Sequence, residues 1–401
     1  MSRRILILGG SRFQLPLIRR ARERGLHVIT CDYLPGNPGH ALADEYHNVS
    51  TTDREAVLAL ARRIGIDAVA SFSSDPAMPA VAYVADALGL PGPPPEAIVR
   101  LTDKGQFRRL MAGAGLRTPR HWVVDAATAE AVGDLAAGLP ADVSRLVVKP
   151  VDSCGSRGVC VVAPDTRDIA RALQGALAYS RAGRCIVEQY VDGLHLHGDG
   201  FLQDGRLVHH YLGDQGFVAG TQDTLPVSTL WPSRHDGAVL ADAARQVEAI
   251  ARAAGLLDGP LNIEARIDSM GRAWIIEIGP RNGGDYIPLI QQQLTGFDFV
   301  GSVLDGALGN LPAAPTTTCR GIGACYTLHA DRDGTYAGLR VSDAIRDRLV
   351  LLEVIRREGE PVRRHADAGT SLGVALLQFD SLAERDSLTA DLRSHLAPQV
   401  R

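Results

Sequence analysis

The chain has 401 residues, of which 45% are hydrophobic and 22% charged, and its formal net charge is -4 at pH 7. This length predicts a globular protein of roughly two to four units, and the absence of a block of like charge argues against a nucleic-acid partner. The six cysteines form no C-x-x-C pair, which fits reduced thiols in a cytoplasm better than disulfides or a zinc knuckle. The apolar run in MSRRILILGG is too short for a signal peptide or a membrane span, so we expect a first strand and no membrane partner.

The first third of the chain alternates between strand-like and helix-like segments. Strands are expected at residues 5–8, 26–31 and 67–72, and helices at residues 15–24 and 53–64. A capping box of Thr52 and Glu55 would begin the second helix. Such alternation predicts a parallel, doubly wound sheet with a ligand site at the carboxyl ends of its strands, near residues 10–14 and 73–76.

A dinucleotide site is the main alternative for this first unit. Asp32 ends the second strand roughly 20 residues after the glycine pair Gly9-Gly10, as in a dinucleotide fingerprint. The glycine that packs the helix is absent, however, and Phe13 and Gln14 stand where a pyrophosphate would approach. These departures argue against nicotinamide binding.

The middle of the chain begins after a proline-rich break at residues 91–95, which reads as a linker. A helix is expected to begin at residues 101–104 and to run to about residue 112, with Thr102 as its N-cap and Lys104 in its first turn. Residues 194–212 predict a β-hairpin with Asp204-Gly205 at its turn. Residues 213–231 look irregular, so they are expected either to cover a substrate or to form an ordinary surface loop.

The most informative stretch is LVVKPVDSCGSRGV, residues 146–159. An apolar strand ends at Lys149, and a loop of small residues follows it. A strand end can direct a lysine at an anion, and a Gly/Ser loop lets backbone N–H groups surround phosphate oxygens. The stretch predicts a nucleoside triphosphate site, although similar loops also occur in proteins that bind no phosphate.

Two carboxylates complete the pattern later in the chain. Glu264 and Glu277 lie on strands expected at residues 261–267 and 273–278, and the turn at residues 269–271 would bring them face to face. Carboxylate oxygens are suitable ligands for Mg²⁺. Four features thus follow one another along the chain. They are Lys104 at a helix start, Lys149 with the Gly/Ser loop after it, the strand end VEQYV at residues 187–191, and the carboxylates Glu264 and Glu277.

This order resembles the ATP-grasp superfamily, which includes biotin carboxylase, the large subunit of carbamoyl phosphate synthetase and carboxylate-amine ligases. The resemblance covers about residues 1–310, and its motifs are KPVDS at 149–153, GSRGV at 155–159 and EIGPRNGG at 277–284. It implies a mixed α/β and α+β fold. The expected parts are a Rossmann-like domain at 1–95, an ATP-grasp domain at 96–310 with a lid subdomain at about 120–190, and a small α+β cap at 311–401 with helices at 341–350 and 382–395.

The resemblance also implies roles for individual residues. Lys104 and Lys149 would contact phosphates, and Glu188 would accept a hydrogen bond from the adenine amino group. Arg281 and Lys149 would be the catalytic residues. The further expected positions are Glu264 and Glu277 for the metal, Ser153, Cys154, Gly155, Ser156, Gly158, Gln189, Tyr190, Val191 and His195 for ATP, and Ser73, Asp75, Asn282, Gly283 and Gly284 for the acceptor.

The activity implied by the resemblance is an ADP-forming ligation of a small carboxylate to a small amine through an acyl phosphate. ATP and Mg²⁺, with Mn²⁺ as an alternative, would be required, and a homodimer is one oligomeric option. A bicarbonate-phosphorylating carboxylase is the alternative within the superfamily, but no biotin carrier motif and no second ATP-grasp half is present. A nucleotide-binding regulator without turnover is the alternative from another class.

Two positions depart from the pattern of the family. Gly279 stands where many relatives have an asparagine as a third metal ligand, so water or Asn262 would have to complete the metal shell, or the protein would be the regulator. His195 stands where many relatives have a ribose-binding glutamate. A zinc site of His195, His197, His209 and His210 is a weaker hypothesis, because no Cys, Asp or Glu ligands close around them. Cys154 is either a redox switch or a small residue that the loop requires.

Overall fold

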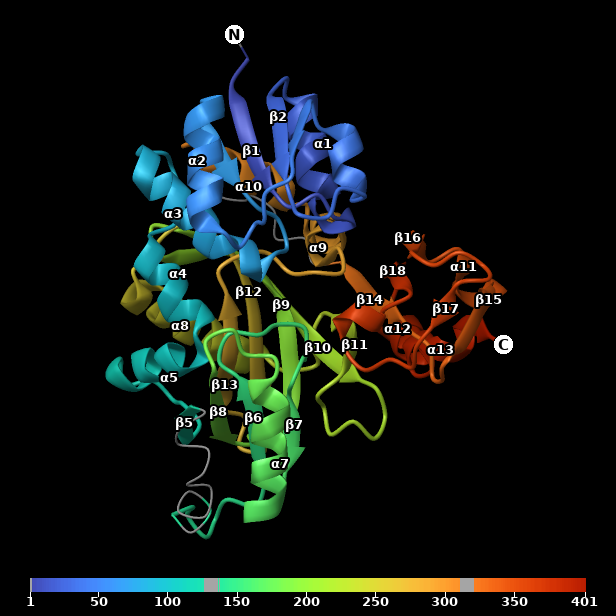
Figure 1. The fold of residues 1–401 in the computed structure, drawn as a ribbon. Helices are drawn as coiled ribbons and strands as arrows, with labels where there is room; N and C mark the ends of the chain where they lie inside the picture. Colours follow the sequence, from blue (N-terminus) through green and yellow to red (C-terminus); the bar gives the residue numbers. More distant parts are fainter. Residues whose placement is uncertain (1, 126–135, 137, 311–320) are drawn as a thin grey trace.

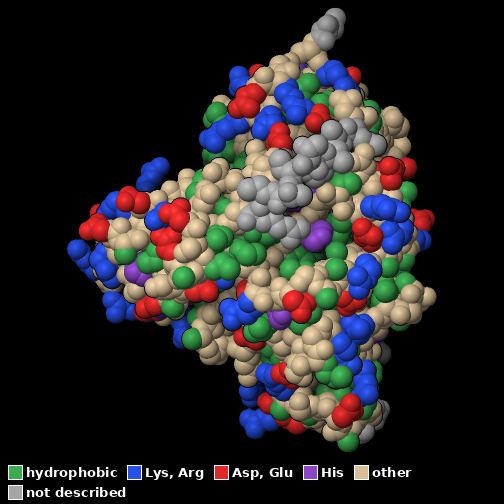
Figure 2. Space-filling view, turned by 180° about the vertical axis from the view of Figure 1, so that it is seen from behind, with side chains coloured by type: hydrophobic (Ala, Val, Ile, Leu, Met, Phe, Trp, Pro, Cys, Tyr) green, Lys and Arg blue, Asp and Glu red, His purple; other side chains and the backbone are tan. Residues whose placement is uncertain are grey.

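The computed structural model describes residues 2–125, 136, 138–310 and 321–401. Figure 1 shows an N-terminal lobe above a central sheet, an extension around α7 below it, and a C-terminal lobe beside it. Part of the expected lid subdomain, the start of the expected cap at residue 311 and Cys319 lie outside the described residues. In the view from behind, positive and negative side chains are interspersed over the surface (Figure 2).

The N-terminal lobe is the parallel sheet that the sequence predicts, with strand order β3-β2-β1-β4. Alternate residues of β1 pack on opposite faces: Leu6 and Leu8 contact one hydrophobic cluster with helices α2 and α3, whereas Ile5 and Ile7 contact another with helix α1. The elements are β1 Arg4–Leu8, α1 Leu15–Glu23, β2 His27–Cys31, β3 Glu45–His47, α2 Arg54–Ile64, β4 Ala68–Ala70 and α3 Met78–Leu88. Helices on both faces confirm the doubly wound arrangement.

Two expected helix starts are wrong. The carboxylate of Asp53, and not Thr52, caps α2 by accepting from the Ala56 N–H. The proline-rich break is not a simple linker, because Pro95 begins a helix, α4 (Pro95–Thr102), that places its missing N–H where no partner is needed. Thr102 therefore ends α4, and Asp103 caps the next helix, α5 (Lys104–Gly113). Lys104 still lies in the first turn of α5, as predicted.

The largest sheet has eight strands in the order β13-β12-β9-β10-β11-β14-β18-β16. Its strands are β9 Leu194–Gln203, β10 Arg206–Phe217, β11 Pro226–Trp231, β12 Gly259–Ile267, β13 Ala273–Gly279, β14 Ile322–Leu328, β16 Leu349–Val354 and β18 Gly373–Phe379. The predicted hairpin is confirmed as β9 and β10. The expectation of an irregular segment at 213–231 is wrong, since β10 and β11 occupy most of it and leave only residues 218–225 as a loop.

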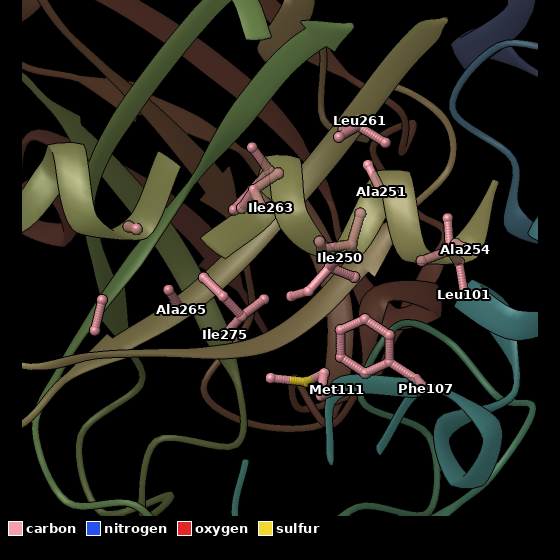
Figure 3. Packing of buried hydrophobic residues seen from close by; sticks show 14 of the residues in the cluster. Leu101, Phe107, Met111, Ile250, Ala251, Ala254, Leu261, Ile263, Ala265 and Ile275 are labelled. Atoms are coloured by element: carbon pink, nitrogen blue, oxygen red, sulfur yellow. The ribbon is translucent and has the colours of Figure 1, made fainter. Parts of the chain in front are cut away.

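One face of this sheet is covered by helices α4, α5 and α8 (Gly237–Ala254). Leu101, Phe107 and Met111 meet Ile250 and Ala254 over the buried side chains of β12 and β13 (Figure 3). The packing fixes the start of α5 beside β13 and so positions Lys104. Helices α9 (Ile287–Thr295) and α10 (Phe299–Ala307) follow β13, and α10 packs on the N-terminal sheet.

The extension below the central sheet is a four-stranded antiparallel sheet of order β5-β8-β6-β7 with helix α7 on one face. Its elements are β5 His121–Asp125, β6 Leu146–Pro150, β7 Cys160–Val162, α7 Thr166–Leu177 and β8 Arg184–Gln189. The loop between β6 and β7 is the Gly/Ser-rich stretch of the sequence. It therefore lies at the end of this sheet that faces the central sheet.

The C-terminal lobe is α+β, as expected, but its helices differ from the prediction. Only Asp343–Arg346 (α11) is helical within residues 341–350, because strands β15 and β16 occupy both ends of that segment. The expected helix at 382–395 is divided into α12 (Leu382–Thr389) and α13 (Leu392–His395), and Asp391 caps the second. Strands β15 (Gly334–Val341), β17 (Pro361–Val362) and β19 (Leu396–Val400) form a small sheet. No described helix is long and apolar enough to cross a membrane.

Single turns of 3-10 helix lie at four described positions. They are Arg12–Gln14, Pro38–Leu42, Asp75–Ala77 and Ala368–Thr370. The first three follow strands of the N-terminal sheet, and the fourth belongs to the C-terminal lobe. Two of them place polar side chains, Gln14 and Asp75, in a cleft at the carboxyl ends of the N-terminal strands, and Ala368 of the fourth lines the same cleft.

Candidate active site

Two connected clefts lie where the lobes meet. The inner cleft has a volume of about 210 Å³. It is lined by Lys149 and Glu188 from the antiparallel four-stranded sheet that contains β6 and β8, and by Glu264 and Glu277 from the eight-stranded sheet. The outer cleft, of about 920 Å³, opens at the carboxyl ends of the N-terminal strands. Both are lined by Glu264, Arg281 and residues 153–155. A group bound at this junction would face both clefts.

A buried network surrounds Glu188. Its carboxylate lies 2.6 Å from Nζ of Lys149 and 2.6 Å from Nε of Arg108. Burial alone would raise the pKa of Glu188, but Arg108 and Lys149 outweigh it and lower the pKa to about 2. Burial, and then Arg108, lower the pKa of Lys149. Glu188 is therefore already occupied on both oxygens in this structure.

Arg108 was missed from the sequence. Its side chain is only 1% exposed and also donates to the backbone oxygens of Ile275 and Ile276 on β13. The signal that would have found it is its spacing, since it lies four residues after Lys104 on α5 and so on the same face of the helix. A charged residue that shares a face with a candidate phosphate lysine is a candidate for the same site.

Lys104 connects the Gly/Ser-rich loop after β6 to the carboxylate pair of Glu264 and Glu277. Its Nζ donates to the backbone oxygen of Ser153 at 2.9 Å and lies 3.3 Å from the Glu277 carboxylate. Burial disfavours the charged amine, but the carboxylate of Glu277 has the larger combined effect and raises the pKa of Lys104. The ammonium group is thus held charged at the floor of the inner cleft.

Glu264 and Glu277 lie directly opposite each other in the antiparallel register of β12 and β13, as the hairpin prediction required. Burial, followed by the charge of Glu277, raises the pKa of Glu264 to about 7. Two facing carboxylates of which one resists ionisation fit a divalent cation, because the cation would stabilise both charges. No group of three or more Cys, His, Asp or Glu side chains gathers for a metal within the described part of the chain.

The suggested third ligand, Asn262, has its amide nitrogen bound to neighbouring side chains. Its Nδ2 donates to Oδ1 of Asp199 at 2.9 Å and lies 3.0 Å from Nε2 of His197. Asp199 is fully buried, and burial raises its pKa to about 6. Of the four histidines of the zinc hypothesis, His197 contacts Thr229 and His209 stacks on Phe297, so these two lie in different surroundings.

Arg281 is held by Asp75 of the N-terminal lobe. Its Nε donates to Oδ1 at 2.7 Å and its Nη2 donates to Oδ2 at 2.5 Å. A Cβ atom at Gly279 would lie 3.2 Å from Cζ of Arg281 and 3.2 Å from Oδ1 of Asp75. The pair therefore lies over the position at which an asparagine side chain would begin, and it explains why this chain has glycine there.

Three of the acceptor candidates bind one another. The Ser73 hydroxyl donates to the backbone oxygen of Gly283 at 2.6 Å, and Nδ2 of Asn282 donates to the Ser73 hydroxyl at 2.7 Å. The N–H of Gly283 donates to the Asp199 carboxylate at 2.8 Å. These contacts join the N-terminal lobe to the segment after β13, while Asp75 binds Arg281 and Gly284 lines the outer cleft.

The strand end after β8 forms one wall of the inner cleft. Tyr190 hydrogen bonds to Asp223, and the guanidinium of Arg266 lies 4.2 Å from the centre of its ring. Arg266 also donates to the backbone oxygen of Val191 at 2.8 Å. Gln189 and Val191 line the cleft as predicted, whereas Arg266 and Asp223 were missed because they come from distant segments.

His195 lies beside this wall. Both of its ring nitrogens are buried without a hydrogen bond of ordinary geometry to any described residue, and burial lowers its pKa to about 2. Its ring contacts Phe217 edge-on at 4.5 Å between centroids. A neutral imidazole with unused nitrogens in a cleft is suited to a polar ligand.

The loop after β6 owes its conformation to small residues. Gly155, Ser156 and Gly158 have φ values of 67°, 63° and 74°, in the left-handed region that favours glycine. Ser153, Cys154, Gly155 and Ser156 line the inner cleft. Burial, and then Asp75, raise the pKa of Cys154, so its thiol form is favoured and it is a weak nucleophile. Ala368 contacts the loop from the C-terminal lobe, with its N–H 3.4 Å from the backbone oxygen of Gly155.

Comparisons with known proteins agree on one family. The family model of an ATP-grasp domain matches residues 143–288. The uncharacterised protein y4rH of Sinorhizobium fredii is 30% identical over 396 residues, which cover 92% of this chain and 77% of that protein. A phosphoribosylamine–glycine ligase of Mycobacterium tuberculosis is 36% identical over 200 residues, but the match covers 47% of this chain and 44% of the ligase.

The fold comparison extends over the full length. The crystal structure of an L-amino acid ligase from Bacillus licheniformis superposes with a TM-score of 0.83 at 21% identity, and the match covers 100% of this chain and 99% of that one. The matched domain contains the loop after β6 and the carboxylates of β12 and β13. The chain belongs to the ATP-grasp superfamily, the family that its sequence motifs resemble.

Proposed function

We propose that the protein is an ADP-forming ligase that joins a small carboxylate to a small amine. The observation that carries the proposal is the junction of the two clefts, where Glu264, Arg281 and the loop after β6 face both spaces. Bound Mg-ATP would supply a terminal phosphoryl group that converts the carboxylate into an acyl phosphate open to attack by the amine. The residues of the junction would position the reactants and stabilise charge.

Each wall of the inner cleft has a role in this proposal. The charged Nζ of Lys104 and the N–H groups of residues 153–158 would bind phosphate oxygens, with Ser153, Cys154, Gly155, Ser156 and Gly158 forming the lid. Glu188 keeps Lys149 at the end of β6, since it already binds that lysine and Arg108. We therefore assign adenine recognition to the backbone of Gln189, Tyr190 and Val191, with His195 facing the ribose.

Glu264 and Glu277 would hold Mg²⁺ or Mn²⁺, with water completing the shell in place of the asparagine that Gly279 replaces. Arg281 would stabilise the transferring phosphoryl group from the outer side of the junction, because its guanidinium is held there by Asp75. Closure of the lid would exclude water from the acyl phosphate. In this proposal the nucleotide occupies the inner cleft and the acceptor occupies the outer cleft.

The finer parts of the proposal concern domains, substrates and location. We assign residues 1–95 to the N-terminal domain, 96–310 to the ATP-grasp domain and 311–401 to the C-terminal domain, and we place the protein in the cytoplasm. Small-molecule acids and amines are the proposed partners, and a homodimer is the proposed assembly. We favour amino-acid-type substrates over bicarbonate, a choice that agrees with the activity named for the L-amino acid ligase.

The test is ATP-dependent phosphate release by the purified protein with pairs drawn from the common amino acids and simple amines. We expect release with at least one pair, together with a product whose mass equals the two substrates less water. Glu277→Gln and Lys149→Met should abolish release, whereas exposed Arg109→Met should not. Nucleotide binding without phosphate release for any pair would instead favour the regulator, and release with bicarbonate alone would favour the carboxylase.

A further inference from the structure

We propose that one of the joined substrates is an amino acid with an aromatic or large aliphatic side chain, bound at the mouth of the outer cleft. The mouth is formed by Tyr33 and Leu34 on the N-terminal lobe and by Tyr179, which follows helix α7 in the extension below the central sheet. The inference rests on the proposed ligase function, because it takes the outer cleft as the place of the acceptor. It replaces the sequence-based acceptor candidates, most of which bind one another.

The three side chains at the mouth are apolar, yet about half or more of each is exposed to solvent. Tyr33 is 61% exposed, Leu34 is 48% exposed and Tyr179 is 51% exposed, and all three line the same cleft. Single exposed apolar side chains are ordinary, but a group of them in one concave region marks a binding site for an apolar ligand. A ligand side chain placed between them would remove apolar surface from water on both walls.

The loop that carries Tyr33 and Leu34 is firmly fixed. The Asp32 carboxylate accepts from the Leu34 N–H at 3.1 Å and from Nδ2 of Asn37 at 2.9 Å. Nε2 of His40 lies 3.1 Å from the backbone oxygen of Leu34. The exposure of the two side chains is therefore a property of an ordered loop, which reduces the entropy lost when a ligand binds.

The deeper part of the outer cleft is polar and suits the charged groups of an amino acid. Asp285 accepts from the Thr327 hydroxyl at 3.0 Å and lies 3.8 Å from the guanidinium of Arg12, whose shorter contact, at 2.8 Å, is with Glu353. Besides Asp285, the carboxylates of Asp32 and Asp152 line the outer cleft, and carboxylates of this kind would attract an ammonium group. The lining of the cleft thus combines polar groups with the exposed apolar side chains.

A phosphorylated sugar is the competing occupant. Arg157 and Arg181 also line the outer cleft, and guanidinium groups bind phosphate well. The exposed apolar side chains at the mouth have no function toward such a ligand. The volume of about 920 Å³ far exceeds the needs of glycine, formate or bicarbonate. We therefore favour the amino acid with a large side chain.

The test measures binding and turnover separately. Ligand-observed NMR with the full-length protein and Mg-ADP would compare L-phenylalanine, L-leucine, glycine and ribose 5-phosphate. We expect phenylalanine or leucine to bind at least about tenfold more tightly than glycine, and Tyr33→Ser or Leu34→Ser to weaken that binding about fivefold or more. The matched control is Leu382→Ser, since Leu382 is 47% exposed but lies in the C-terminal lobe.

In turnover, the mouth variants should raise KM for the large amino acid while KM for ATP and kcat at saturation stay within twofold of wild type. Large amino acids that bind without phosphate release for any substrate pair would keep the binding site at the mouth but remove the ligase proposal, and with it the role of the amino acid as a joined substrate. Glycine or ribose 5-phosphate binding as tightly as phenylalanine and leucine, no binding of either large amino acid, or mouth variants that behave like Leu382→Ser would overturn the inference.

Discussion

Asp75 binds the guanidinium of Arg281 through both carboxylate oxygens, although the two residues come from different lobes. The pair places Arg281 at the junction of the inner and outer clefts. An arginine fixed in this way presents its remaining donors without a loss of side-chain freedom at the moment of reaction. We regard Asp75 as a positioning residue for Arg281.

Asp75→Asn should therefore lower kcat for phosphate release by about tenfold or more while KM for ATP changes little, because a small misplacement of a catalytic group has a large effect on rate. Steady-state kinetics with a productive substrate pair would measure both constants. The control is Asp305→Asn, since the Asp305 side chain is 25% exposed and pairs with Arg24, compared with 21% exposure for Asp75. Equal kcat values for the two variants would remove the positioning role.

Gly279→Ala should move Arg281, because the added Cβ would lie 3.2 Å from its Cζ. We expect a fall in kcat without recovery in Gly279→Asn, even though the asparagine would restore the ligand type common in the family. The control is Gly175→Ala on helix α7, where an added Cβ has no neighbour within 4 Å. Higher activity in Gly279→Asn than in wild type would show that the missing ligand matters more than the Arg281–Asp75 pair.

Arg108→Met should destabilise the fold by about 1–3 kcal/mol, because it removes the hydrogen bonds of the guanidinium to the buried Glu188 carboxylate and to the backbone oxygens of Ile275 and Ile276. Urea unfolding monitored by circular dichroism would measure the change. Arg109→Met, at the exposed neighbouring position, should shift the midpoint very little. The double variant Arg108→Met with Glu188→Gln should lose more stability than the single variant, because it also leaves buried Lys149 without its charged partner. A double variant as stable as Arg108→Met would contradict the pairing of Lys149 with Glu188.

Acid should weaken the fold through Glu188. Its pKa is lowered from 4.5 to about 2 in the folded protein, so the stabilisation is complete above about pH 4.5 and is lost as the pH falls toward 2. Urea midpoints between pH 5 and pH 3 should therefore fall more steeply in wild type than in Glu188→Gln, which has no carboxylate to protonate. Parallel slopes would contradict the ion-pair account of this network.

The features of the site that could be predicted from the sequence are those that depend on residues close together in the chain. Lys149 and the glycines of the phosphate-loop candidate are adjacent in the chain, and Glu264 faces Glu277 because a short turn joins their strands. Asp75 and Arg281 are 206 residues apart, and their pairing depends on how two lobes dock. Arg108 on helix α5 pairs with Glu188 on β8, 80 residues later, so its partner could not be read from local pattern, although its spacing from Lys104 was a signal for the site.

Other errors arose where neighbouring signals compete. Thr102 and Asp103 are both good helix caps, and only the extent of α4 shows that Thr102 ends one helix while Asp103 begins the next. Residues 213–231 contain several turn-forming residues, yet pairing with neighbouring strands makes most of them β-structure. Tertiary contacts determine the secondary structure of such segments, and these contacts cannot be inferred from a single sequence.

The strand pairing between β11 and β14 has a practical consequence for any shortened form of the protein. Residues 228–231 pair with residues 323–326, so the central sheet continues without interruption into the C-terminal lobe. A chain ended near residue 310 would leave β11 as an open edge with unsatisfied N–H and C=O groups, which favours association with other strands. It would also lose the Ala368 contact with the loop after β6. Crystallisation or assay of the catalytic region therefore requires the complete C-terminal lobe, and removal of that lobe is expected to change turnover as well as solubility.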